Sequence, residues 1–210
     1  MNSATQALTL AGAAGPIEAL LDVPAAAPRG TTVIAHPHPL FGGTMHNKVV
    51  QTLARAFVQA GWRVLRFNFR GVGASAGVYD EGRGEAQDML ALVQQEAPEG
   101  PLALAGFSFG AFVTSQALAA LAPRQPDKVV LVGTAASRFA VAPIAPELHE
   151  RTLVLHGERD DTVPLASVMD WARPQSLPVT VIPGGEHFFH GQLPLLKSLV
   201  LRHLAAPLNP

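Results

Sequence analysis

Hydrophobic positions along the chain follow two alternating patterns. Short apolar runs, typical of strands buried on both faces, are separated by stretches in which apolar residues recur at helical spacing. Strands are predicted at residues 8–10, 17–23, 31–35, 62–69, 101–105, 129–132, 152–155 and 179–182. Helices are predicted from about residue 47, over residues 86–93, from residue 109 to about 121, over residues 165–172 and from residue 194 onward. This alternation predicts an α/β fold, with a mostly parallel sheet covered by helices on both faces.

The predicted parallel strands place their carboxyl ends along one edge of the sheet, because crossover connections between parallel strands are right-handed. Ligand-binding groups of α/β folds gather at that edge. The residues that directly follow each strand are therefore the candidates for chemistry.

The strongest candidate is a serine in a turn between the strand at residues 101–105 and the next helix. Residues 106–110, with the sequence GFSFG, have the G-x-S-x-G spacing of a nucleophile elbow, in which small neighbours accommodate a crowded backbone. Such a turn lifts the Ser108 hydroxyl above the sheet edge. It also places the next N–H at a helix N-terminus, where negative charge is stabilised. The pattern predicts Ser108 as a nucleophile if suitable partners exist.

Two later strand ends supply an acid and a base. Asp160 follows the strand at residues 152–155, and His187 follows the strand at residues 179–182. The chain order of serine, acid and histidine is that of α/β-hydrolases and differs from the orders of the chymotrypsin and subtilisin folds. Asp161 is the alternative acid, and His190, three residues beyond His187, is the alternative base.

These residue types match the needs of acyl transfer. A serine hydroxyl is a weak nucleophile near neutral pH unless an adjacent base removes its proton during attack. An imidazole, with an ordinary pKa of about 6.5, accepts that proton and then returns it to the leaving group. A carboxylate orients the imidazole and stabilises its protonated form. We therefore expect Ser108 as nucleophile, His187 as base and Asp160 as the orienting acid.

An oxyanion hole is predicted from the turn at Ser108 and from the loop after the strand at residues 31–35. Pro37 and Pro39 have no N–H, so His38 is the donor between two fixed φ angles. Together with the Phe109 N–H it would bind the developing negative oxygen. The alternative is that Leu40 donates while His38 only packs.

Composition agrees with a small-molecule enzyme. We expect one domain over residues 1–210, with 48% hydrophobic and 15% charged residues. A formal net charge of −1 without a basic run argues against nucleic acid or an anionic membrane as partner and favours small neutral substrates. The absence of cysteine excludes disulfides and thiolate catalysis. With no basic segment before Leu8 and no apolar run of roughly 18 residues, we expect a cytoplasmic protein.

Five ordered motifs carry a resemblance to a known family. They are His36-Pro37-His38-Pro39 with Gly42-Gly43, Arg70-Gly71-Val72-Gly73-Ala74-Ser75, Gly106-Phe107-Ser108-Phe109-Gly110, His156-Gly157-Glu158-Arg159-Asp160 and Gly185-Glu186-His187-Phe188-Phe189. Over nearly its whole length the chain resembles small, cap-less bacterial α/β-hydrolases related to dienelactone hydrolases and simple carboxylesterases. The resemblance implies a triad of Ser108, Asp160 and His187, with an oxyanion hole after Pro37 and Ser108. Dienelactone hydrolases carry cysteine where this chain has Ser108, so their substrate does not transfer to it.

Two further patterns are explained without a cofactor or metal. Gly71-Val72-Gly73 follows a strand as in dinucleotide-binding loops, but the third glycine is Gly77 rather than residue 76, so a tight crossover loop is expected. His36, His38 and His46 lie close in sequence without an acidic neighbour, so no metal site is expected.

The segment at residues 136–151 is too short for a helical lid. An open cleft suits short acyl esters, because long lipids need extended apolar burial. Five phenylalanines are candidates for its lining or for the core: Phe41, Phe107, Phe109, Phe188 and Phe189.

We expect a serine carboxylesterase that hydrolyses small esters through an acyl-enzyme on Ser108, as a monomer or homodimer. A thioesterase, lactonase or small-peptide hydrolase would use the same residues, and a ligand-binding protein without catalysis is the alternative of another class.

Overall fold

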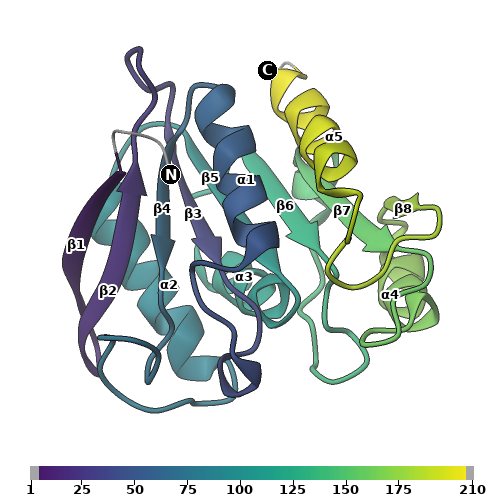
Figure 1. The fold of residues 1–210 in the computed structure, drawn as a ribbon, viewed down its shortest axis with the longest axis horizontal. Helices are drawn as coiled ribbons and strands as arrows, with labels where there is room; N and C mark the ends of the chain where they lie inside the picture. The colour runs from purple at the N-terminus through teal and green to yellow at the C-terminus, as the bar shows by residue number, and fades with distance from the viewer. Residues whose placement is uncertain (1–4, 207–210) are drawn as a thin grey trace.

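The computed structural model describes residues 5–206, and their strands form one eight-stranded sheet (Figure 1). The strands are β1 (Thr5–Gly12), β2 (Gly15–Asp22), β3 (Thr31–Ala35), β4 (Arg63–Phe67), β5 (Leu102–Phe107), β6 (Lys128–Val132), β7 (Thr152–Gly157) and β8 (Val179–Ile182). Their order in the sheet is β1-β2-β4-β3-β5-β6-β7-β8. β2 pairs antiparallel with β1 and β4, whereas the strands from β4 to β8 pair in parallel. The predicted mostly parallel sheet is confirmed.

Helices cover both faces of this sheet. They are α1 (Lys48–Gln59), α2 (Arg83–Glu96), α3 (Phe109–Ala120), α4 (Leu165–Ala172) and α5 (Leu193–Ala205), with three short 3-10 turns, η1 (Pro39–Phe41), η2 (Pro146–Arg151) and η3 (Arg173–Gln175). α1 and α5 pack on one face, and α2, α3 and α4 pack on the other (Figure 1). Each helix buries apolar residues against the sheet, although Leu195 of α5 stays exposed.

The first helix illustrates how local sequence sets an element. Asn47 caps α1, since its side-chain oxygen accepts a hydrogen bond from the Val49 N–H at 2.8 Å. Val50, Leu53 and Phe57 then face the sheet and are fully buried. The predicted start near residue 47 and the predicted apolar stripe are therefore confirmed.

Several strand boundaries differ from the prediction, and the ends of β4 and β5 show the reason. β4 ends at Phe67 rather than at Phe69, because the Phe69 N–H donates to the imidazole of His36 instead of to a neighbouring strand. β5 continues beyond residue 105 to Phe107, because Gly106 still pairs with Ala35 of β3. Both differences arise from pairing with segments that are distant in sequence.

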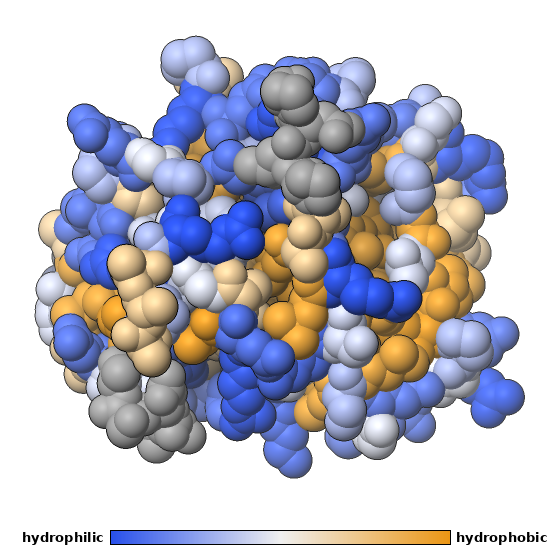
Figure 2. Space-filling model, turned by 90° about the horizontal axis from the view of Figure 1, so that it is seen from above, coloured by the Kyte–Doolittle hydropathy of each residue, from blue (hydrophilic) through white to orange (hydrophobic). Residues whose placement is uncertain are grey.

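The parallel strands point toward the lower edge of the molecule in Figure 1, where the loops that carry the candidate residues lie. At this edge, residues 133–151 between β6 and β7 contain only the short turn η2 and no α-helix. Figure 2 shows the opposite end, where hydrophilic residues are mixed with hydrophobic patches. Within residues 5–206, no helix is both long and apolar enough to cross a membrane.

Candidate active site

Ser108 occupies a strained turn between β5 and α3. Its φ of 57° and ψ of −117° lie outside the regions that residues with a side chain favour. A Cβ atom at Gly106 would lie 2.2 Å from the Gly110 carbonyl oxygen, and one at Gly110 would lie 2.3 Å from the Ala35 carbonyl oxygen. The turn therefore requires both glycines of the G-x-S-x-G motif.

The side chains of Ser108, His187 and Asp160 form a continuous hydrogen-bonded chain. Ser108 Oγ lies 3.0 Å from His187 Nε2, and His187 Nδ1 lies 2.7 Å from Asp160 Oδ2. Because an ionised carboxylate only accepts hydrogen bonds, Nδ1 carries the ring proton and Nε2 is the free acceptor that faces the hydroxyl. All three residues are buried, so their mutual interactions are weakly screened by water.

Backbone groups hold the second oxygen of Asp160. The N–H groups of Thr162 and Val163 donate to Asp160 Oδ1 at 3.0 and 2.7 Å. Beside them, His156 Nε2 donates to the Val163 carbonyl at 2.9 Å and lies 3.6 Å from Asp160 Oδ2. Burial lowers the pKa of His156, so the ring supports this loop as a neutral group. Only one oxygen of Asp160 is thus free to orient His187.

The imidazole of His187 fits over a glycine and between two phenylalanine rings. Gly133, which follows β6 with a φ of 55°, lies so close that an added Cβ atom would be 3.3 Å from His187 Cε1. The ring centres of Phe107 and Phe188 lie 5.0 and 5.1 Å from that of His187. These contacts restrict the imidazole to the orientation that joins the acid and the serine.

The residues expected to bind an oxyanion, His38 and Phe109, lie around the same cleft as Ser108. Phe109 is the first residue of α3, where an N–H group has no acceptor within the helix. The Leu40 N–H, the alternative second donor, is engaged by His38 Nδ1 at 3.2 Å. His38 and Phe109 both line the cleft with Ser108, and their ring centres are 4.8 Å apart. This arrangement favours His38 over Leu40 as the second donor.

The alternative acid and base lie outside the hydrogen-bonded chain. Asp161 is exposed, and its carboxylate lies 3.4 Å from the Thr162 hydroxyl. His190 is exposed and pairs with Glu186 at 3.2 Å. Among residues 5–206, no three histidine or acidic side chains lie close enough together to hold a metal ion.

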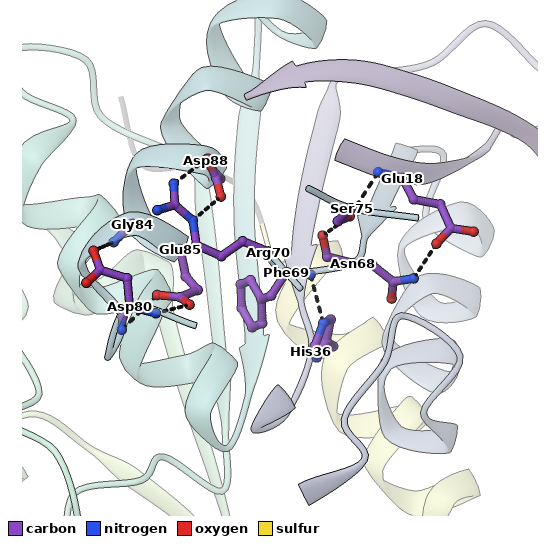
Figure 3. A network of polar contacts seen from close by, with 11 residues as sticks. Glu18, His36, Asn68, Phe69, Arg70, Ser75, Asp80, Gly84, Glu85 and Asp88 are labelled. Atoms are coloured by element: carbon purple, nitrogen blue, oxygen red, sulfur yellow. Dashed lines mark hydrogen bonds and ion pairs between the residues drawn. The ribbon is translucent and has the colours of Figure 1, made fainter. Parts of the chain in front are cut away.

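A buried histidine fixes the loop that follows β4 (Figure 3). His36 Nε2 accepts a hydrogen bond from the Phe69 N–H at 3.0 Å, and His36 Nδ1 donates to the Pro37 carbonyl at 2.6 Å. Burial lowers the pKa of His36 to about 4, so the ring is neutral near pH 7. Both nitrogens are used by the backbone, which gives His36 a structural role.

Polar side chains close the same loop against β2 (Figure 3). Glu18 Oε2 accepts hydrogen bonds from the Ala74 N–H at 2.9 Å and from Asn68 Nδ2 at 2.7 Å, and these bonds lower the pKa of Glu18. The Ser75 hydroxyl donates to the Asn68 carbonyl at 2.7 Å and accepts from the Glu18 N–H at 3.0 Å. The glycine-rich segment is thus a crossover loop held by its neighbours.

The other half of this loop is joined to α2 by charged residues (Figure 3). Arg70 binds both carboxylate oxygens of Asp88 at 2.8 and 2.9 Å, and this pairing raises the pKa of Arg70. Glu85 is fully buried and accepts hydrogen bonds from the N–H groups of Asp80 and Gly82 at 2.9 and 2.8 Å. The loop is therefore held in place from both sides.

An open cleft of about 310 Å³ lies in front of Ser108. Three of the five candidate phenylalanines, Phe41, Phe109 and Phe188, line it, whereas Phe107 and Phe189 are fully buried in the core. Other lining residues carry no catalytic motif in the sequence, namely Asn47, Ala135, Arg138, Phe139, Thr162 and Val163. The lining residues that follow β6 belong to no motif. In the sequence, only their position beyond a strand end indicates that they lie near the site.

Comparison with known proteins agrees with this geometry. Residues 26–150 match the family described as serine aminopeptidase, S33 (Hydrolase_4). An uncharacterized protein of Rickettsia prowazekii (strain Madrid E) is 33% identical over 180 residues, which cover 75% of this chain and 71% of that protein. The crystal structure of a serine hydrolase without lid from Xanthomonas campestris has a TM-score of 0.88 and 36% identity, covering 100% of this chain and 99% of that chain. The structure of an α/β serine hydrolase homologue from Coxiella burnetii has a TM-score of 0.79 and 36% identity, covering 95% and 97%.

These similarities extend over the whole length of the sheet. The family match covers more than half of the chain and includes Ser108. The two solved structures extend the similarity to the segments that carry Asp160 and His187. The chain belongs to the Hydrolase_4 family and is a small α/β serine hydrolase.

Proposed function

We propose that the protein is a carboxylesterase that hydrolyses small esters through an acyl-enzyme on Ser108. The observation that carries this proposal is the hydrogen-bonded chain from Ser108 through His187 to Asp160, which opens into an apolar cleft. Nucleophile, base and acid stand in the roles that acyl transfer requires.

The first half of the reaction transfers the acyl group to the serine. His187 Nε2 takes the proton from Ser108 Oγ while that oxygen bonds to the carbonyl carbon of the ester. The carbonyl oxygen becomes an oxyanion, which the N–H groups of His38 and Phe109 stabilise. The carbon–oxygen bond of the leaving group then breaks, and its oxygen receives the proton from His187. The alcohol departs, and an ester on Ser108 remains.

The second half repeats these steps with water. His187 removes a proton from the water as its oxygen attacks the acyl carbon, and the same N–H groups stabilise the second oxyanion. The bond to Ser108 Oγ then breaks, and Oγ recovers the proton from His187. The products are the free acid and an unchanged enzyme. Asp160 stays ionised and stabilises the imidazolium in both halves.

The cleft supports a small ester as substrate. It is largely apolar, with Phe41, Phe139 and Phe188 in its lining, and it has no helical cover within residues 5–206. A short acyl chain finds enough apolar surface there, whereas a long lipid chain would extend into water. Thioesters and lactones require the same chemistry and differ from such esters only in the leaving group.

The family description makes a peptide substrate the second candidate. An aminopeptidase must bind the terminal ammonium of its substrate, and a carboxylate is the usual counter-charge for such a group. The residues that line the cleft include no aspartate or glutamate, and they include the cation Arg138. This lining favours an ester over the amino end of a peptide.

Labelling with a fluorophosphonate tests the proposal. The native protein is expected to react at one serine, and the Ser108→Ala variant is expected to lose both labelling and hydrolysis of p-nitrophenyl acetate. Ser137→Ala is the matched control, because Ser137 is exposed on the loop after β6. Native protein that folds but neither labels nor hydrolyses the ester would favour a binding protein. Labelling that persists in the Ser108→Ala variant would contradict the assigned nucleophile.

A further inference from the structure

One arginine is among the residues that line the largely apolar cleft. Arg138 lies on the loop after β6 and lines the cleft together with Ser108 and the aromatic side chains. No aspartate or glutamate is among the lining residues. The chain as a whole has a net charge of only −1, so this local positive charge is not apparent from composition.

The backbone around Arg138 is firmly held. The N–H groups of Arg138 and Phe139 both donate to the Ala135 carbonyl, at 3.2 and 3.1 Å. The Phe139 ring stacks on Phe112, with ring centres 4.8 Å apart and an interplanar angle of 15°, and contacts Phe109 at 5.1 Å. The arginine therefore extends from a fixed turn.

The guanidinium of Arg138 has no acidic partner among residues 5–206. By contrast, Arg66 pairs with Asp22 and Arg70 pairs with Asp88. An exposed guanidinium that faces an apolar cleft is available to a ligand. Its planar array of donors matches a carboxylate in a two-pronged arrangement.

The position of Arg138 indicates which part of the substrate it meets. The leaving-group oxygen must face His187 Nε2 to receive its proton, so the acyl chain points away from that ring. Arg138 lines the same cleft as His38. The charge of Arg138 also adds to burial in lowering the pKa of His38. The carbonyl oxygen faces the N–H groups of His38 and Phe109, so the acyl chain takes the remaining direction, into the cleft that Arg138 lines.

We propose that Arg138 binds a carboxylate at the far end of the acyl chain, so that the preferred substrates are monoesters of short dicarboxylic acids. This inference rests on the esterase activity proposed above and specifies its substrate class. It replaces the expectation of neutral substrates, because the net charge of a protein does not report the charge at one cleft. The aromatic residues would contact the methylene groups between ester and carboxylate.

Two esters of equal acyl length test this inference. Monoethyl glutarate carries the carboxylate, and ethyl pentanoate carries a methyl group in its place. Release of ethanol at pH 7.5 yields kcat/KM for each, and the ratio of the two values measures the preference for the anion. In the native enzyme this ratio is expected to favour the glutarate ester.

Arg138→Gln is expected to lower the ratio about tenfold, since a hydrogen-bonded ion pair that is partly open to water contributes about that much. Arg138→Lys should retain part of the preference because it keeps the charge. Arg173→Gln is the matched control. Arg173 is exposed on η3 and pairs with Asp170, and its substitution by glutamine removes the same charge from the protein. Its ratio should equal that of the native enzyme.

The outcomes separate this inference from the proposed function. If the native enzyme hydrolyses both esters but Arg138→Gln leaves their ratio unchanged, the carboxylate site is wrong and the esterase remains. If Arg173→Gln lowers the ratio as much as Arg138→Gln, long-range charge rather than a contact explains the preference, and the site is again wrong. If the native enzyme hydrolyses neither ester, the proposed function itself fails.

Discussion

Two of the three buried imidazoles at the edge formed by the carboxyl ends of the strands, His36 and His187, differ in the groups that surround them. His36 follows β3 and bonds to two backbone groups, the Phe69 N–H and the Pro37 carbonyl. His187 follows β8 and bonds to two side chains, Asp160 and Ser108. In each ring both nitrogens form hydrogen bonds, so neither burial nor the number of hydrogen bonds distinguishes the two histidines.

The difference lies in what the partners can do. A backbone amide neither gains nor loses a proton, so the region around His36 can only hold a loop in place. A serine hydroxyl gives up its proton to a base during attack, and a carboxylate stabilises the cation that results. His36 with the loop after β4 is therefore a structural region, whereas His187 with its two partners is a reactive region.

The largest expected effect is on the reactive region. Asp160→Asn should lower kcat by about 10⁴-fold, because the asparagine amide can donate to His187 Nδ1 and so favour the tautomer that cannot accept the serine proton. The measurement is kcat for p-nitrophenyl acetate near pH 7.5, with circular dichroism to confirm folding. The two regions would not differ as described if His36→Gln lowered kcat as much as Asp160→Asn.

The next effect is on the stability of the structural region. Asp88→Ala leaves the guanidinium of Arg70 largely buried without its carboxylate, and should lower the free energy of unfolding by about 3 kcal/mol. Urea unfolding measures this change. Asp170→Ala is the matched control, since it breaks an exposed pair with Arg173 and should cost less than about 1 kcal/mol. Equal losses in the two variants would show that the loop after β4 does not depend on its buried ion pair.

The smallest effect is a pH dependence of stability at His36. Its pKa is about 4 in the folded protein and about 6.5 in an unfolded chain, so the unfolded state binds the proton more readily between these values. Stability due to the neutral ring is therefore complete above about pH 6.5 and declines as the pH falls toward 4. Between pH 7 and pH 5 the loss is about 2 kcal/mol.

Urea unfolding of the native protein and of His36→Gln at both pH values measures this contribution. Glutamine offers an oxygen to the Phe69 N–H but does not gain a proton in this range. The variant should lose about 2 kcal/mol less than the native protein between pH 7 and pH 5. The same loss in both proteins would mean that acid acts elsewhere in the molecule.

Much of the fold could be predicted because its signals are local. The apolar stripe of α1 and its Asn47 cap lie within a few residues of each other, and so do the glycines around Ser108. The ends of β4 and β5 could not be predicted in this way. Phe69 leaves the sheet to meet His36, and Gly106 stays in it to meet Ala35, and neither partner is near in sequence.

The candidate site likewise contains residues that local motifs predict and residues that only the folded chain brings together. Motifs at strand ends identified Ser108, Asp160 and His187, because a tight turn at such an end imposes its own residue pattern. Arg138 and Phe139 follow β6 without such a pattern, so only the folded chain brought them into the cleft. The sequence favoured Asp160 over its neighbour Asp161, and in the structure the carboxylate that contacts the imidazole is that of Asp160.

By itself, the sequence determined the order of elements, the strained turn at the serine and the kinds of group available at the sheet edge. These follow from backbone geometry and apolar periodicity, which act over a few neighbouring residues. Only the tertiary structure decided which groups meet, which histidine is confined by the backbone and which charge enters the cleft. Those outcomes depend on the packing of segments far apart in the chain, and that packing sets the distances over which hydrogen bonds and charges act.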